Sequence, residues 1–278
     1  QSDPAAYGGG TVQVSWSGET DIADAPGDGD KPPVSGWIQL KAARDLLANS
    51  GQDFDKLAAA ASRKGFRPVP LSRVKASLGF DNALRRHSSK NVIGILPGTR
   101  RPDEYVLSTA HWDQLGKCEP APDGDDICNG AVDNASGTAA LIALAEANAK
   151  AGPAERSMVF IAFTAEESYL LGADRYAADP VFPLAKTVGG INMDTLMPMP
   201  PARNVVMIGR GKSGLDAYLD RALEIQGRVN SPDPAPERGA YYRSDHFSLA
   251  KRGVPMLDLK GGDDLIGGGT AAGGALAG

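Results

Sequence analysis

The sequence lacks both a long hydrophobic run and an excess of positive charge. Its longest apolar stretches, such as residues 139–145, are far below the roughly 18 residues that a membrane-spanning helix needs. The 29 Lys and Arg residues are outnumbered by 34 Asp and Glu residues, and the net charge is -5. Binding to nucleic acid through phosphate contacts needs a basic surface. The composition therefore predicts no membrane span and no nucleic-acid partner.

Cysteine is scarce, and glycine and proline are common. The two cysteines, Cys118 and Cys128, lie in one acidic loop that also contains Pro and Gly. A disulfide that closes such a loop suits a protein in the periplasm or outside the cell, and we expect this pair to be bonded; two free surface thiols are the alternative. The 34 Gly and 20 Pro residues among 278 indicate a folded, loop-rich protein, since the share typical of disorder is roughly 25–30%.

The two ends differ in composition from the middle. The chain starts at Gln1 without a basic and apolar signal segment, and residues 267–278 are rich in Gly and Ala without the pattern of a helix end or a strand. We expect a piece of a longer chain. Residues 1–36, rich in Gly, Pro and Asp, are expected to be an appended segment with one strand at 11–16.

Short apolar runs alternate with polar loops and helical patterns from residue 91 onward. Strands are predicted at 91–96, 105–110, 158–163, 188–193, 204–208 and 254–259. Helices are predicted at 37–48, 54–61, 135–150, 168–178, 213–226 and 244–252. Near-continuous apolar strands indicate a sheet that is buried on both faces. The pattern predicts an α/β fold, a three-layer sandwich in which a mostly parallel central sheet lies between helices.

Acidic side chains and one imidazole stand at the ends of these predicted strands or at the start of a helix. They are His111, Asp113, Asp133, Glu166, Glu167 and Asp194. In layered α/β folds, ligands collect outside the carboxyl ends of the strands. One imidazole with several carboxylates is a ligand set that suits zinc. We therefore expect a metal site at this edge of the sheet.

Each of these residues also has a purely structural interpretation. Residues 164–167 match a helix capping box, in which Glu167 reaches back to the amide of Thr164. Asp133 could cap the helix that starts at residue 135, Asp194 could be a turn residue, and a lone His111 could be structural. Independent caps would not need to gather at one edge of the sheet, which favours the metal site.

Five segments carry a resemblance to a known family. They are residues 111–113 (His-Trp-Asp), 129–137 (around Asp133), 163–167 (around Glu166), 192–194 (Asn-Met-Asp) and 244–246 (Ser-Asp-His). In order and spacing they resemble the co-catalytic di-zinc aminopeptidase family, whose relatives include aminopeptidase Y, glutamate carboxypeptidase II, glutaminyl cyclase and the transferrin receptor. The resemblance implies a zinc-exopeptidase-like fold. Residues 1–36 resemble the tail of a protease-associated domain and its linker, which leaves 37–278 as a catalytic domain that is incomplete at its C-terminus.

The resemblance also implies a role for each residue of the set. Asp133 would bridge two zinc ions, His111 and Asp194 would complete one ion, and Glu167 would bind the other. Glu166 would be the general base that takes a proton from the bridging water and delivers it to the leaving amine.

The resemblance has three further implications, for Asp113, for one peptide bond and for the reaction. Asp113 would orient the imidazole of His111. The peptide bond between Asp133 and Asn134 would be cis. The implied reaction is the removal of the N-terminal residue from a peptide. Alternatives are a carboxypeptidase or dipeptidase, a glutaminyl cyclase, and a receptor-like domain without catalysis.

Histidine is too scarce to give each zinc ion an obvious ligand. The chain has three, His87, His111 and His246, and His87 lies in a basic stretch and is expected to face solvent. Spacing alone favours His246 as the ligand of the second ion. The resemblance instead places that ligand in a later Tyr-His segment, and places Asp245 and His246 beside the site or in the substrate pocket. We therefore expect the ion held by His111 to bind more tightly than the second.

Overall fold

The structure is a computed structural model that describes residues 20–22, 38–72, 74–75, 77–79, 81, 83–197 and 199–277. The expected strand at 11–16 and nearly all of the segment likened to a protease-associated domain lie outside these residues. Residues 38–87 and 88–277 belong to two separate units, so the predicted catalytic domain contains parts of both.

The first unit contains two of the predicted helices, α3 (Leu40–Asn49) and α4 (Phe54–Ala61). Asp53 caps α4, because its side chain accepts a hydrogen bond from the amide of Lys56. The guanidinium of Arg44 on α3 makes two hydrogen bonds of 2.7 Å to the carboxylate of Asp55 on α4. Sequence spacing therefore predicts both helices, and one bidentate ion pair joins them.

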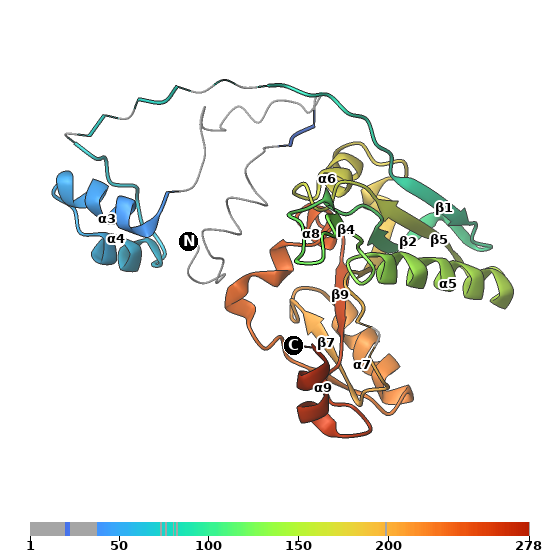
Figure 1. Cartoon of the computed structure of the whole chain (residues 1–278). Helices are drawn as coiled ribbons and strands as arrows, with labels where there is room; N and C mark the ends of the chain where they lie inside the picture. The colour runs from blue at the N-terminus through green and yellow to red at the C-terminus, as the bar shows by residue number, and fades with distance from the viewer. Residues whose placement is uncertain are drawn as a thin grey trace. The chain divides into compact units, whose positions relative to one another are not determined.

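The second unit contains a seven-stranded sheet (Figure 1). Its strands are β1 (Val92–Leu96), β2 (Arg101–His111), β5 (Arg156–Phe163), β6 (Thr187–Met193), β7 (Asn204–Ile208), β8 (Val229–Ser231) and β9 (Met256–Gly261). Their order is β1-β5-β2-β6-β9-β7-β8. Only the pairs β1–β5 and β7–β9 are antiparallel. The predicted α/β fold with a mostly parallel sheet is therefore confirmed.

Helices cover both faces of the sheet. On one face, α6 (Leu171–Ala178) and α8 (His246–Ala250) pack on side chains that include Leu107, Ile161 and Phe163. On the other face, α5 (Ala135–Ala151) packs on Phe160 and Met193. α7 (Leu215–Ile225) packs on β7 and β9. Burial of each large apolar side chain contributes about 1.5–3 kcal/mol. No helix in the described part of the chain is long and apolar enough to cross a membrane.

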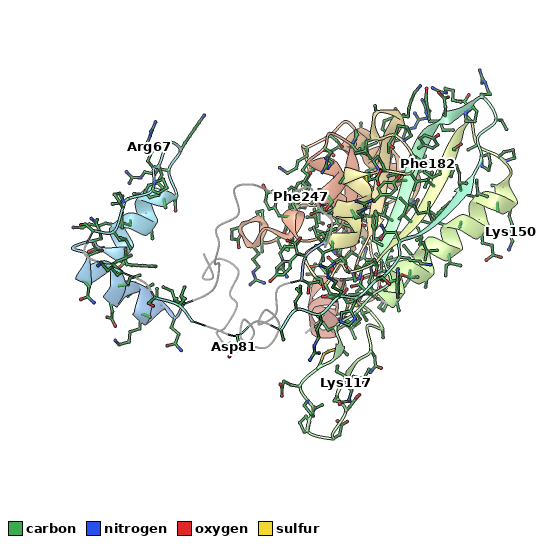
Figure 2. The ribbon with its side chains drawn as sticks, turned by 90° about the horizontal axis from the view of Figure 1, so that it is seen from above. Arg67, Asp81, Lys117, Lys150, Phe182 and Phe247 are labelled. Atoms are coloured by element: carbon green, nitrogen blue, oxygen red, sulfur yellow. A yellow bond between two sulfur atoms is a disulfide. The ribbon has the colours of Figure 1, made fainter. Side chains whose placement is uncertain are left out.

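The acidic loop that contains both cysteines forms a small hairpin. Its strands are β3 (Gly116–Lys117) and β4 (Ile127–Cys128), and Lys117 is labelled on this loop in Figure 2. Cys118 and Cys128 are joined by a disulfide, as predicted. Three short 3₁₀ helices complete the unit, η1 (Leu184–Lys186), η2 (Pro236–Arg238) and η3 (Ala240–Tyr242).

Two sequence predictions need correction. The helix predicted at 168–178 begins only at Leu171, because Tyr169 and Leu170 have φ values of 70° and 63°, outside the helical region. The C-terminal stretch, where no helix was expected, forms α9 (Gly269–Ala277). This helix lies so close to a neighbouring loop that a Cβ on Gly273 would be 2.0 Å from the carbonyl oxygen of Asp263. Small residues permit that approach, and no periodic apolar pattern marks it.

Candidate metal centre

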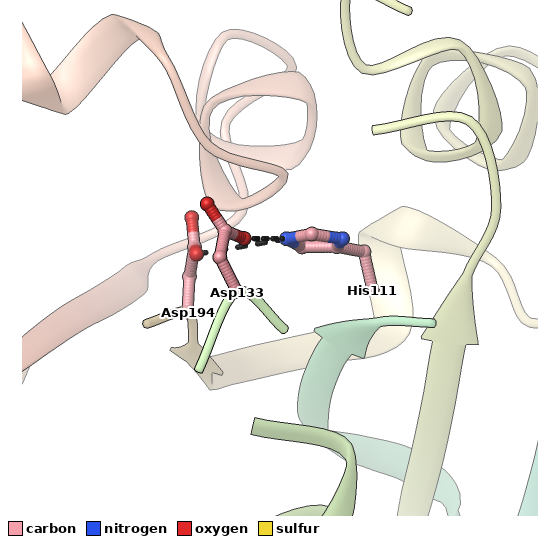
Figure 3. Close-up of side chains that lie close together, drawn as sticks. All are labelled: His111, Asp133 and Asp194. Carbon is pink, nitrogen blue, oxygen red and sulfur yellow. Dashed lines mark ion pairs between the residues drawn. The ribbon is translucent and has the colours of Figure 1, made fainter. Parts of the chain in front are cut away.

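Three of the predicted ligands meet at the carboxyl edge of the sheet. His111 is the last residue of β2, Asp133 lies in the loop before α5, and Asp194 directly follows β6. One ligand atom from each lies within 4.8 Å of the other two (Figure 3). The Nε2 atom of His111 is 3.0 Å from Oδ1 of Asp133 and 3.6 Å from Oδ1 of Asp194. We call His111, Asp133 and Asp194 the metal group.

The distances and chemistry of the metal group fit a bound cation. Ligand atoms about 2.0–2.2 Å from a tetrahedral zinc ion lie about 3.3 Å from one another. The measured separations of 3.0 and 3.6 Å lie on either side of that value. Oδ1 of Asp133 is buried and has no hydrogen-bond partner among the described residues. An oxygen buried in this way beside another carboxylate is stabilised by a positive charge, which a metal ion would supply.

Asn134, not Asp133, caps the helix. The side chain of Asn134 accepts a hydrogen bond of 2.9 Å from the amide of Gly137 in the first turn of α5. The peptide bond between Asp133 and Asn134 is cis, as predicted. Because Asn134 caps α5, the carboxylate of Asp133 does not cap it, and this carboxylate lies beside His111.

Glu166 and Glu167 lie in the turn after β5. Oε2 of Glu166 is 3.9 Å from Nε2 of His111. Neither Glu166 nor Glu167 belongs to the metal group. The capping-box interpretation is wrong, because the amide of Thr164 donates to the side chain of Asn91 and α6 starts only at residue 171. Both glutamates thus follow β5, at the carboxyl end of that strand.

Asp113 contacts both His111 and the glutamate turn. Nδ1 of His111 is 3.2 Å from the main-chain oxygen of Asp113 and 3.7 Å from its carboxylate. That carboxylate accepts hydrogen bonds from the amides of Glu166 at 3.1 Å and Glu167 at 3.4 Å. Asp113 therefore ties the imidazole to the turn that contains both glutamates.

Burial and neighbouring charges shift the pKa values of the metal group. Burial disfavours the charged form of His111, but the neighbouring carboxylates of Asp113, Asp133 and Asp194 outweigh burial and raise the pKa of the imidazole well above 6.5. Burial also opposes the charge of Asp194, yet His111 and Lys260 bring the pKa of that carboxyl below its ordinary value. The carboxylates of the metal group thus favour a positive charge beside them.

The acidic groups around the metal group shift in the opposite direction. Burial, followed by the charge of Asp245, raises the pKa of Glu166 to about 9. Burial and the charge of Asp133 raise the pKa of Glu167. Burial raises the pKa of Asp245 well above its ordinary value. The site gathers more carboxylates than its own cations balance, which is a favourable setting for a divalent metal ion.

The other two histidines lie outside the metal group. His87 is exposed, as expected. His246 is fully buried at the start of α8, where its ring lies 4.9 Å from that of Tyr241, and its Nδ1 is 3.8 Å from Oδ2 of Asp258. The ring centroid of Phe247, a residue labelled in Figure 2, lies 6.0 Å from that of Tyr241. Asp245 is buried, and its carboxylate has no hydrogen-bond partner within the described part of the chain.

Lys260, the second-last residue of β9, is a further residue at the site that the sequence patterns did not indicate. Its Nζ donates a hydrogen bond of 2.6 Å to the main-chain oxygen of Asp194 and lies 3.8 Å from Oδ2 of the same residue. Its position in the sequence could have identified it. Lys260 directly follows the strand predicted at 254–259 and so falls at the same sheet edge as the predicted ligands.

Sequence comparison finds relatives among peptidases. Over 267 residues the chain is 32% identical to aminopeptidase NAALADL1 of Mus musculus, an alignment that covers 82% of this chain and 33% of the mouse protein. Aminopeptidase YwaD of Bacillus subtilis is 35% identical over 34% of this chain and 18% of its own length. A probable zinc metalloprotease of Pyrenophora teres is 40% identical over 31% of this chain and 18% of its own length. The chain thus spans about a third or less of these relatives.

Two solved structures also align with part of this chain. A zinc aminopeptidase from Bacillus subtilis aligns with a TM-score of 0.47 and 24% identity over 62% of this chain and 40% of its own. A glutaminyl cyclase from an Acidobacteriales bacterium aligns with a TM-score of 0.44 and 22% identity over 63% of this chain and 59% of its own.

Most of the second unit matches a known peptidase family. The model of peptidase family M28 matches residues 91–271, a range that contains the whole metal group, both glutamates and Lys260. The expected membership of a peptidase family is confirmed, and the metal group supports the expectation of a metal. With this match and the alignment to the mouse aminopeptidase, the chain belongs to peptidase family M28.

Proposed function

We propose that this chain carries the catalytic site of a zinc-dependent exopeptidase that removes the N-terminal residue of peptides. The observation that carries the proposal is the meeting of His111, Asp133 and Asp194 beside Glu166 at one sheet edge. Membership of family M28 and relatives named as aminopeptidases support a peptide substrate.

The residues divide into those that hold metal and one that moves a proton. His111, Asp133 and Asp194 would hold one zinc ion, and Asp133 and Glu167 would hold a second. The charge of Asp133 adds to burial in raising the pKa of Glu167, which supports a site shared by these two carboxylates. When bound, zinc would lower the pKa of the attacking water and polarise the scissile carbonyl.

The position of Glu166 supports a role as the general base. Its carboxylate is buried near the metal group, 3.9 Å from the imidazole, and is not a member of that group. A base must reach the water that attacks the substrate while remaining free to accept its proton. Glu166 would then deliver this proton to the departing amine. Asp113 fixes the turn that carries Glu166 through two main-chain amides.

The disulfide bears on where the protein works. Disulfides persist in oxidising compartments, and Cys118 and Cys128 are bonded in the hairpin loop. We therefore include secretion or a periplasmic location in the proposal.

Peptides with blocked ends test the reaction. The zinc-loaded protein is incubated with one peptide in three forms: free, acetylated at the N-terminus, and amidated at the C-terminus. An aminopeptidase releases the first residue from the free and amidated forms and leaves the acetylated form intact. Release of the last residue from the acetylated form would indicate a carboxypeptidase instead, and cyclisation of an N-terminal glutamine would indicate a glutaminyl cyclase.

A further inference from the structure

Each member of the metal group has its main-chain carbonyl held by a side-chain donor from elsewhere in the chain. The three bonds run from Oγ1 of Thr138 to His111 (2.8 Å), from Nε2 of Gln114 to Asp133 (2.7 Å) and from Nζ of Lys260 to Asp194 (2.6 Å). The donors come from α5, from the loop after β2 and from β9. We call Thr138, Gln114 and Lys260 the donor set.

The three carbonyls lie where regular structure ends. His111 is the last residue of β2, Asp194 directly follows β6, and Asp133 precedes α5. Backbone at such positions has fewer main-chain partners to fix it than backbone within a ladder or helix. A hydrogen bond to the carbonyl restrains the peptide plane, and thereby the Cα atom and the direction in which the ligand side chain leaves it.

We infer that Thr138, Gln114 and Lys260 are positioning residues that hold the three metal ligands in place before the ion binds. The inference rests on the proposed function, in which the metal group holds zinc. Metal sites depend on partners behind the ligands, and loss of such a partner typically lowers metal affinity 10–100-fold. The donor set acts on the ligands through the backbone, and this distinguishes it from Asp113, which contacts the imidazole itself.

Lys260 adds a charge to its hydrogen bond. Its ammonium lies 3.8 Å from Oδ2 of Asp194, and its side chain is 29% exposed. It thus offsets part of the negative charge that Asp133 and Asp194 bring together at this edge. Of the three donors it should have the largest effect, because its removal takes away both a hydrogen bond and a positive charge.

Substitutions that keep the shape of each side chain and remove its donor test the inference. We would prepare Thr138→Val, Gln114→Met and Lys260→Met in the full chain and measure zinc affinity by competition with a chelator. We would also record the visible absorption of the Co²⁺ form, which reports the geometry of the ligands. The expected result is a 10–100-fold loss of affinity in each variant and a changed Co²⁺ spectrum. Thr138→Ser and Lys260→Arg retain a donor and should return towards the wild-type values.

Two control variants remove similar bonds away from the metal group. Thr99→Val deletes a 3.1 Å bond to the carbonyl of Ala154, and Lys186→Met deletes a 3.0 Å ion pair with Asp103. Both should bind zinc like the wild type. Thermal unfolding of each metal-free variant shows whether it folds, and if one variant does not, the other two decide.

The outcomes separate the inference from the function beneath it. If the wild type binds no zinc, the proposed function fails. If the wild type binds zinc and the three donor variants match Thr99→Val and Lys186→Met in affinity and Co²⁺ spectrum, the positioning role is refuted while the proposed function stands.

Discussion

The side-chain amide of Asn134 donates a 3.0 Å hydrogen bond to the main-chain oxygen of Met193, and these two residues are the direct neighbours of Asp133 and Asp194. The Oδ1 atom of the same side chain accepts from the amide of Gly137 in α5. A Cβ on Gly137 would lie 2.3 Å from both Asn134 Oδ1 and the Met193 oxygen, so only glycine fits this approach. One buried side chain thus joins the loop of one metal ligand to the strand of another.

Replacing Asn134 should destabilise the fold. Asn134→Ala removes a helix cap, which costs about 1 kcal/mol, and leaves the buried Met193 carbonyl without its donor, which costs about 1–3 kcal/mol. We expect the free energy of unfolding, measured by urea denaturation of the metal-free protein, to fall by about 2–4 kcal/mol. Asn148→Ala is the control, because among the described residues the half-buried side chain of Asn148 hydrogen-bonds only to its own helix. Equal effects of the two substitutions would contradict this role.

Substitution of Glu166 should separate catalysis from metal binding. Glu166→Gln removes the proposed base and keeps the size of the side chain, so peptidase activity should fall about 10²–10⁴-fold while zinc affinity stays close to that of the wild type. Asp194→Asn should lose zinc, because it removes a charged ligand. Activity assays combined with zinc titration check both. A loss of zinc from Glu166→Gln as severe as that from Asp194→Asn would identify Glu166 as a ligand rather than a base.

Zinc titration should reveal one tight site. Among the residues that the structure describes, one group of three ligands can hold an ion, and three protein ligands are the usual number for catalytic zinc. We expect one equivalent to bind tightly, and Glu167→Gln and His246→Ala to leave that equivalent in place. Isothermal calorimetry gives the stoichiometry. Two tight equivalents that become one in His246→Ala would show that His246 is a ligand after all.

The buried pair His246 and Asp258 should give opposite pH dependences of stability. Burial lowers the pKa of His246 to about 4, so only the unfolded chain takes up this proton as pH falls from 6.5 towards 4, and stability is lost over that range. Burial raises the pKa of Asp258 to about 6, so the folded chain takes up its proton first as pH falls from 6, and stability is gained. Each effect is at most about 1.4 kcal/mol per pH unit.

Single variants should reveal each half of this pair. Relative to the wild type, His246→Gln should become more stable as pH falls from 6.5 to 4, and Asp258→Asn should become less stable as pH falls from 6 to 4. Denaturation curves at pH 4, 5, 6 and 7 give the two slopes. The prediction is wrong if both differences have the same sign of slope.

Local sequence determined most of the elements and the identity of the ligands. Apolar runs of five or six residues that polar loops and helical patterns separate indicate buried strands, so β1, β2, β5, β6, β7 and β9 follow from pattern. The candidate ligands followed from residue type and position, because His111 and Asp194 stand at the ends of such strands and Asp133 stands just before a predicted helix. The strands β3, β4 and β8 have only two or three residues and are too short to show any alternation.

Only the tertiary structure decided which carboxylates face one another and what holds them. The contacts of Asn134, Gln114, Thr138 and Lys260 join residues that are 19 to 66 positions apart, and no local pattern encodes such a distance. The structure also shows that Gly273 in α9 permits a close approach to the main chain of Asp263, a contact that no periodic apolar pattern marks. Sequence periodicity indicates which face of a helix or strand is buried. Which residues contact that face depends on how the whole sheet packs with its helices.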